Sequence, residues 1–212
     1  MTNTSGNHDD LHCTNKLGRI VLLALEEMLG NTGVTSMLYQ AGLPHLINNY
    51  PPNNLDAGFP FGDLASIHQT LDALYGPRGG RGVALRAGRA CLKYGMIEFG
   101  PVPGVSEQNF RLLPLASKIR VGAQAFANTI NQHSDHPLQF EESPEGFLWT
   151  IERCPICWGR HSDSPCCHLL VGVLQEALFW LSCGRNYRVE EISCVAKGDS
   201  ACSILIDRHP ID

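Results

Sequence analysis

Residues 164–168 read SPCCH and residues 191–202 read EISCVAKGDSAC. In the second segment Cys194 and Cys202 lie symmetrically about Gly198. If they flank a hairpin loop with an odd number of residues, and Gly198 supplies the positive φ that such loops need, their sulfurs face each other across neighbouring strands. The pattern therefore predicts a hairpin whose two thiols can share one metal ion.

Two further ligands come from the preceding helix and from the hairpin itself. Apolar spacing, a serine cap and a proline at the first position predict a helix over residues 165–183. Cys167 then lies in its first turn, where the helix dipole stabilises a thiolate, and Glu191 completes four ligands of types that zinc accepts. Because Glu191 and Cys194 are three residues apart, they point to opposite faces of an ideal strand. The zinc site therefore requires a β-bulge or a ligand reached from the strand edge.

Cys154 and Cys157 offer a competing site. They could join Cys166 and Cys167 in a four-thiolate zinc site, or act as a redox dithiol. The spacing is not that of the usual zinc ribbon, and a turn is expected after Cys157 where a thioredoxin-type dithiol would open a helix. A structural turn with free thiols is the third interpretation. For the whole set, the alternative to metal binding is buried cysteines that pack as small apolar residues.

The rest of the chain predicts a mixed α+β fold. Apolar residues at three- and four-residue steps predict helices over about 17–28, 34–46, 64–74, 83–95 and 114–132. The segment RGGRG at 78–82 is expected to be a connecting turn, because it matches neither the dinucleotide-binding nor the P-loop pattern. Short apolar runs predict one hairpin over 138–151 and another over 187–206. This order favours an antiparallel sheet packed with helices, with a zinc-braced C-terminal helix and hairpin.

Composition indicates one globular domain. The chain has 212 residues, 43% hydrophobic and 17% charged, and we expect a disordered leader over 1–14 and a single domain over 15–208, with a zinc-binding subregion over 154–206. The net charge of -5 and the lack of a basic stripe argue against a nucleic-acid partner. No apolar run would span a membrane and the N-terminus has no export signal, so a soluble, cytoplasmic protein is expected. In that reducing compartment nine cysteines fit metal binding better than disulfides.

Three side chains are candidates for ligand binding. Arg86 and Arg89 lie in the predicted helix over 83–95, where their guanidinium groups could pair with a carboxylate on a ligand. Phe126 belongs to an apolar helical stripe that could wall a ligand cavity. Solvated surface arginines and ordinary core packing are the alternative interpretations.

These motifs resemble the signature of the 4-vinyl reductase domain family. The likeness rests on SPCCH at 164–168, on Gly172 and on the Glu-x-x-Cys-x-Ala-x-Gly-Asp-x-x-Cys pattern over 191–202, and residues 86–103 resemble the bacteriochlorophyll-biosynthesis member. The resemblance implies an α+β, small-molecule-binding domain, related to the sensory domains of phenol-responsive activators. In those sensors a zinc ion braces a pocket for a small apolar ligand, and members are commonly dimeric, which implies a homodimer.

The zinc ligands of those sensors map onto Cys167, Glu191, Cys194 and Cys202. The connection from Cys167 to Glu191 is about one residue longer here, which leaves Glu190 as the alternative fourth ligand. His168, next to Cys167, could replace that cysteine or bind the metal of a tetrapyrrole axially, or could be a helix-surface residue.

The family name implies reduction of a vinyl group on a chlorophyll precursor. Such chemistry needs an electron source, but the sequence has neither a dinucleotide fingerprint nor an iron–sulfur cysteine run, and four protein ligands would close the zinc to substrate. Whether the chain is an enzyme is therefore left open. The preferred hypothesis is a zinc-containing carrier of a tetrapyrrole or another hydrophobic molecule, linked to bacteriochlorophyll biosynthesis and photosynthesis. The alternatives are a catalyst or subunit of divinyl-tetrapyrrole 4-vinyl reduction, and a stand-alone ligand sensor that acts through a partner.

Overall fold

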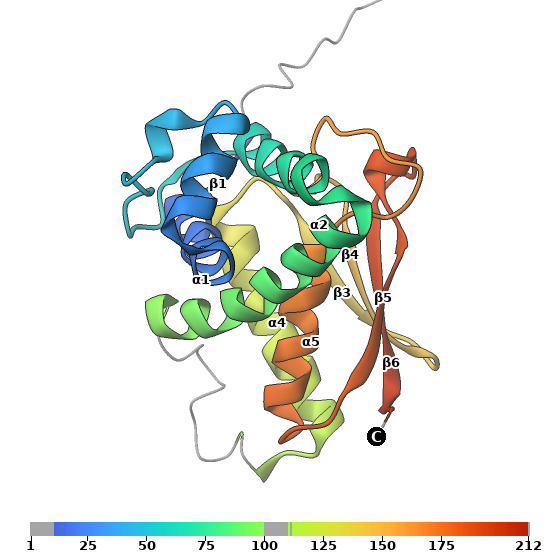
Figure 1. The fold of residues 1–212 in the computed structure, drawn as a ribbon. Helices are drawn as coiled ribbons and strands as arrows, with labels where there is room; N and C mark the ends of the chain where they lie inside the picture. Colours follow the sequence, from blue (N-terminus) through green and yellow to red (C-terminus); the bar gives the residue numbers. More distant parts are fainter. Residues whose placement is uncertain (1–10, 100–109, 111, 212) are drawn as a thin grey trace, which may run out of the picture.

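The computed structural model describes residues 11–99, 110 and 112–211, in which helices cover one face of an antiparallel sheet (Figure 1). The sheet has the strand order β3-β4-β6-β5, and all neighbouring strands are antiparallel. Its strands are β3 (Leu138–Glu142), β4 (Gly146–Ile151), β5 (Tyr187–Ser193) and β6 (Cys202–Pro210). The predicted α+β class and both predicted hairpins are confirmed.

Helices that the apolar periodicity predicted in outline lie on one side of this sheet, some against it and others packed on those helices. They are α1 (Asn15–Gln40), α2 (Phe61–Phe99), α4 (Leu115–His133) and α5 (His168–Leu181), with the short 3-10 turns η1 (Pro44–Leu46) and η2 (Val195–Lys197). Two predicted helices merge in α1 and two in α2, each pair joined by a glycine with φ of 70° and ψ of 167°, Gly30 in α1 and Gly76 in α2. No helix within the described ranges is long and apolar enough to cross a membrane.

The N-terminal boundary differs from the predicted leader. Residues 1–10 of that leader lie outside the described residues, but β1 (His12–Thr14) pairs with β2 (Ala57–Pro60) in a separate two-stranded sheet. Residues 100–103, the end of the segment that resembles the bacteriochlorophyll-biosynthesis member, also lie outside the described part. Backbone pairing with β2 therefore orders the chain from residue 12.

The segment 78–82 is helical, which corrects the predicted turn. It forms part of α2 after the kink at Gly76, and Pro77 occupies the first position of the resumed helix, where its missing N–H costs no hydrogen bond. The tertiary packing of α2 overrides the weak helix propensity of three glycines. As a consequence, Arg78 and Arg81 lie one turn apart on a helical face.

Helix α5 lies between α2 and the sheet and connects the two layers (Figure 1). The backbones of α2 and α5 touch where two glycines meet. A Cβ on Gly88 would lie 2.0 Å from the carbonyl oxygen of Leu169, and one on Gly172 would lie 2.1 Å from that of Leu85. Only glycine permits this approach, so the crossing sets the position of the first turns of α5 against α2.

Replacing Gly88 by alanine should therefore destabilise the protein by about 1–3 kcal/mol or more, because α5 must move away from α2. The free energy of unfolding in urea measures the effect. Gly82→Ala is the matched control: it lies in the same helix, a Cβ added there would have nothing within 4 Å, and a helical alanine should stabilise by up to about 1 kcal/mol. If Gly88→Ala and Gly82→Ala changed the free energy of unfolding equally, the close contact of α2 and α5 at Gly88 would be contradicted.

A buried histidine in α2 makes stability depend on pH. His68 is 3% exposed, its Nε2 has no hydrogen-bond partner among the described residues, and burial, with Arg160 adding a smaller effect, lowers its pKa from 6.5 to about 3. Below pH 6.5 the His68 imidazole is protonated in the unfolded chain but stays neutral in the folded chain. The stability that the neutral ring contributes is therefore fully present above pH 6.5 and is lost as the pH falls.

Between pH 7.5 and pH 5.5 the wild-type protein should lose about 1.4 kcal/mol more stability than a His68→Leu variant. Urea unfolding at the two pH values measures the difference. The same pH dependence in both proteins would show that His68 is protonated in the folded state.

Candidate metal centre and adjoining cavity

The β5–β6 hairpin brings Cys194 and Cys202 together as the sequence predicted. Gly198 has a φ of 103°, and the two sulfurs lie 3.9 Å apart. Two hydrogen bonds from backbone N–H groups to side chains stabilise the loop. The N–H of Cys194 donates to Oδ2 of Asp199 at 2.8 Å, and that of Val195 donates to Sγ of Cys202 at 3.3 Å. Both thiols are buried and face the start of α5.

Glu191 reaches the same place through an irregularity of the strand. The β5–β6 register shifts between Glu191 and Ser193, which is the bulge that the three-residue spacing required. Oε2 of Glu191 accepts the N–H of Cys167 at 2.7 Å, while Oε1 is buried and has no hydrogen-bond partner among the described residues. Glu190 is exposed and paired with Arg188. The structure thus brings Glu191, and not Glu190, to the cysteines.

Cys167 lies at the N-terminus of α5, where the helix dipole favours a thiolate. The helix begins at His168 rather than at residue 165, so Cys167 caps the helix instead of lying in its first turn. Its sulfur is 3.6 Å from that of Cys202. We call Cys167, Glu191, Cys194 and Cys202 the hairpin quartet: one ligand atom of each lies within 4.8 Å of the others, and all four residues are buried.

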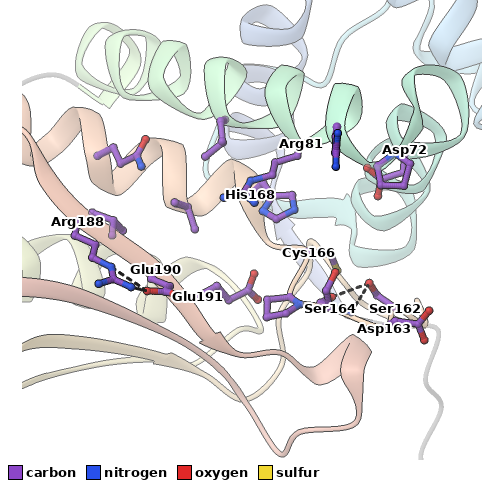
Figure 2. A pocket seen from close by; sticks show the side chains of 17 residues that line it. Asp72, Arg81, Ser162, Asp163, Ser164, Cys166, His168, Arg188, Glu190 and Glu191 are labelled. Atoms are coloured by element: carbon purple, nitrogen blue, oxygen red, sulfur yellow. Dashed lines mark hydrogen bonds and ion pairs between the residues drawn. The ribbon is translucent and has the colours of Figure 1, made fainter.

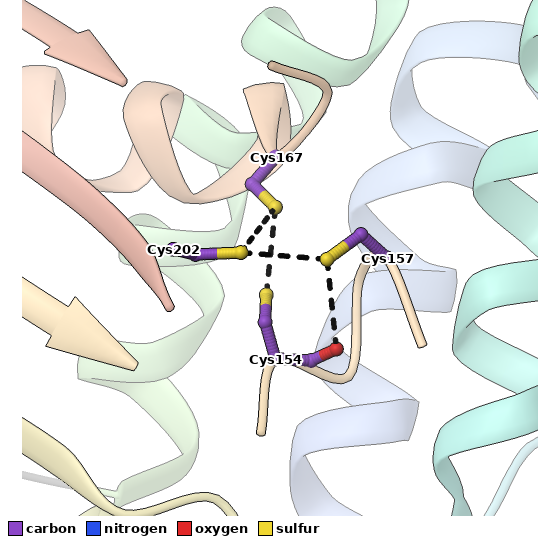
Figure 3. Close-up of side chains that lie close together, drawn as sticks. All are labelled: Cys154, Cys157, Cys167 and Cys202. Atoms are coloured by element: carbon purple, nitrogen blue, oxygen red, sulfur yellow. Dashed lines mark hydrogen bonds between the residues drawn. The ribbon is translucent and has the colours of Figure 1, made fainter. Parts of the chain in front are cut away.

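A second group of four overlaps the first. The turn after β4 places Sγ of Cys154 at 3.4 Å from that of Cys167, and Sγ of Cys157 at 3.4 Å from that of Cys202 (Figure 3). We call Cys154, Cys157, Cys167 and Cys202 the thiol quartet; its sulfurs also lie within 4.8 Å of one another.

The thiol quartet differs from the alternative expected from the sequence, in which Cys166 was the partner. Cys166 points instead toward Cys194, with 3.9 Å between their sulfurs. Cys202 therefore takes the place that the sequence assigned to Cys166.

These distances fit metal ligands. Four sulfurs around a zinc ion at about 2.3 Å lie roughly 3.8 Å apart, whereas a disulfide would bring two of them to about 2.05 Å. The measured contacts run from 3.4 Å to 3.9 Å. Burial, with Cys194 as the next cause, raises the pKa of Glu191 to about 8, a cost that a nearby cation would remove. The cluster could therefore hold a metal ion.

A cavity of about 790 Å³ adjoins the cluster, between α2, α5 and β5 (Figure 2). Cys166 and Glu191 line it on the side of the cluster, and Arg78 and Arg81 line it from α2. Neither arginine forms an ion pair within the described part of the chain, whereas the lining residue Asp72 is bound to Arg160 at 2.7 Å. The cavity thus presents two arginines that have no ion pair in this part of the chain, together with the carboxylates of Asp163, Glu190 and Glu191.

His168 lines this cavity and is not part of either quartet. It begins α5 next to Cys167, and its ring lies among the side chains that line the cavity (Figure 2). Burial, with Arg81 as the next cause, lowers the pKa of its imidazole. A neutral imidazole here can bind a ligand in the cavity, whereas replacement of Cys167 in the cluster is not supported.

The three side chains expected to bind a ligand do not line this cavity. Arg86 and Arg89 are exposed on α2, and Arg89 donates to the lining residue Gln175 at 3.0 Å. Phe126 packs edge-on against Trp149 at 5.9 Å between ring centroids. The residues that do line it, Arg78 and Arg81, were missed because the glycines around them indicated a turn. Their spacing of three residues, the spacing of one helical face, was the available signal.

Comparison with known proteins agrees with the motifs. Residues 148–208 match the family model of the 4-vinyl reductase domain, which confirms the resemblance predicted from the cysteine motifs. The chain is also 27% identical over 191 residues to the bacteriochlorophyll synthase 23 kDa chain of Cereibacter sphaeroides, with 84% of this chain and 82% of that protein covered.

The fold is similar to that of H-NOX proteins. The structure of a doubly substituted Tt H-NOX matches with a TM-score of 0.56 and 15% identity over 94% of this chain and 97% of that one. An H-NOX protein from S. oneidensis in the Fe(II)NO ligation state matches with a TM-score of 0.56 and 14% identity over 91% and 98%. An oxygen-binding H-NOX domain related to soluble guanylate cyclases matches with a TM-score of 0.53 and 13% identity over 91% and 94%. At these identities the likeness concerns the fold alone.

Because Cys202 belongs to both quartets, Cys202→Ser should lower both the metal content and the stability. The expected loss is several kcal/mol, up to the roughly 10 kcal/mol that structural zinc contributes to small domains. Elemental analysis of the purified protein and its thermal unfolding measure the two effects. Cys183→Ser, at an exposed cysteine outside the cluster, is the control and should change neither. Unchanged metal content in Cys202→Ser would contradict the metal centre.

Proposed function

We propose that this chain is a zinc-containing protein that binds and carries a tetrapyrrole or a similar hydrophobic molecule for bacteriochlorophyll biosynthesis. The observation that carries the proposal is the cavity that abuts the buried cysteine cluster and presents the unpaired Arg78 and Arg81. The similarity to the bacteriochlorophyll synthase 23 kDa chain supports the pathway. The fold shared with H-NOX proteins supports a ligand held within this architecture.

Zinc is the metal of this proposal, and Cys167, Glu191, Cys194 and Cys202 are its ligands. Three thiolates and a carboxylate suit zinc, and four protein ligands leave it no open position for a substrate. Its role is then structural: it would hold the start of α5 against the β5–β6 hairpin, next to the cavity. The orphaned Oε1 of Glu191 supports this assignment, because a buried carboxylate oxygen without a partner is costly unless it meets a cation.

The ligand class follows from the lining of the cavity. Leu85, Val171 and Val189 provide apolar surface, while Arg78 and Arg81 provide guanidinium groups. Guanidinium groups bind carboxylates through paired hydrogen bonds. A molecule with an apolar body and a carboxylate side chain, as tetrapyrrole precursors have, satisfies both. His168 could then bind the central metal of such a molecule.

The second candidate is a subunit of the enzyme that reduces the vinyl group of a divinyl tetrapyrrole, which the match to the 4-vinyl reductase domain favours. The two differ in turnover: a carrier binds its ligand unchanged, and a reductase consumes NADPH. The proposal also includes the homodimer. Trp180 and Phe179, at 50% and 42% exposure near the end of α5, supply apolar surface for such a contact.

Titration of the purified protein with divinyl protochlorophyllide, followed by absorbance and fluorescence, should show saturable binding without turnover when NADPH is added. Arg81→Ala should weaken binding by about 10-fold or more, because a charge-assisted hydrogen bond contributes about 1.5–3 kcal/mol. Arg86→Ala, on the same helix but away from the cavity, is the control and should bind like the wild type. Equal affinity of all three proteins would contradict the site, and NADPH-dependent reduction would contradict the carrier.

A further inference from the structure

The two quartets share Cys167 and Cys202, so together they comprise six residues rather than eight. The members peculiar to the thiol quartet, Cys154 and Cys157, come from the turn after β4. Those peculiar to the hairpin quartet, Glu191 and Cys194, come from β5 and the loop that follows it. The shared pair thus has two further pairs of ligands that reach it from different segments.

The shared sulfurs have the spacing of bridging ligands. Those of Cys167 and Cys202 lie 3.6 Å apart, close enough for both to contact the same two ions. In the thiol quartet Cys154 and Cys157 each lie 3.4 Å from a shared sulfur. In the hairpin quartet Cys194 lies 3.9 Å from Cys202, and the carboxylate of Glu191 accepts the N–H of Cys167.

A single ion would leave part of this arrangement unexplained. An ion in the hairpin quartet leaves Cys154 and Cys157 as buried thiols packed against metal-bound sulfurs. An ion in the thiol quartet leaves Glu191 buried with an oxygen that has no partner among the described groups. Buried ionisable groups are expensive unless each is paired or bound to a metal. Two ions that share two thiolates use all six residues, each with four ligands.

We propose that the cluster binds two zinc ions bridged by the thiolates of Cys167 and Cys202, one completed by Cys154 and Cys157 and the other by Glu191 and Cys194. The proposal of a second ion rests on the zinc site of the proposed function. The second ion would join the turn after β4 to the segments that the first ion holds together. The centre then connects β4, the start of α5, and the β5–β6 hairpin in one closed structure.

The full-length protein, reconstituted with zinc, should contain two zinc ions per chain by native mass spectrometry and by elemental analysis. A Cys154→Ser/Cys157→Ser double variant should contain one, and the Cys183→Ser control should contain two. One ion in the wild type, or the same count in the wild type and the double variant, would overturn the bridged pair. A single ion that the double variant retains would leave the hairpin zinc site standing, and a single ion that it loses would place the metal in the thiol quartet. Binding of divinyl protochlorophyllide is measured separately and would stand in either case, so the two proposals fail separately.

A measurement on the wild-type protein keeps the proposal testable if the double variant does not fold. After exchange of zinc for cadmium-113, the nuclear magnetic resonance spectrum should show two cadmium signals that are coupled to each other through the bridging sulfurs. The ion with four sulfur ligands should resonate at the higher frequency, because the other has an oxygen ligand. A single signal, or two uncoupled signals, would show that Cys167 and Cys202 do not bridge two ions.

Discussion

The buried cysteine cluster joins segments that are far apart in the sequence: the turn after β4, the residue before α5, and both ends of the β5–β6 loop. Thiols at this density do not hold a structure together by themselves, because each contributes little apolar area and their charged forms repel one another when buried. A divalent ion reverses that balance, since it stabilises every thiolate and the Glu191 carboxylate at once. The position of α5 relative to the sheet then depends on this centre.

The position of α5 is also fixed by its crossing with α2. Gly88 and Gly172 let the two backbones touch, so the first turns of α5 are held by α2 on one side and by the cluster on the other. Because α5 is held on both sides, the walls that it contributes to the neighbouring space can move little. The cavity lies in that space, lined by α2, the start of α5 and β5.

Metal centre and cavity share residues, which ties structure to function. Glu191 accepts the N–H of Cys167 and also lines the cavity, and His168 follows Cys167 in the chain. A change in the cysteine cluster therefore moves part of the cavity wall directly. Under the proposed function, a zinc ion without an open coordination position influences ligand binding because it positions this wall rather than touching the ligand.

The sequence by itself determined the local features. The symmetry of Cys194 and Cys202 about Gly198 predicted the hairpin, because a positive φ at a loop glycine is a local requirement. The three-residue spacing from Glu191 to Cys194 required a bulge or a ligand reached from the strand edge, and the register shift between Glu191 and Ser193 matches the first. The apolar periodicities predicted the α+β class, because burial of one face imposes a period of 3.6 in helices and of 2 in strands. Only the tertiary structure decided which of Cys166 and Cys202 joins Cys154 and Cys157, and that Arg81, rather than Arg86, faces the cavity. Those choices depend on contacts between residues distant in the chain and on packing that makes a glycine-rich segment helical. The three-residue spacing of Arg78 and Arg81 suits one helical face, but by itself it does not show that the segment is helical.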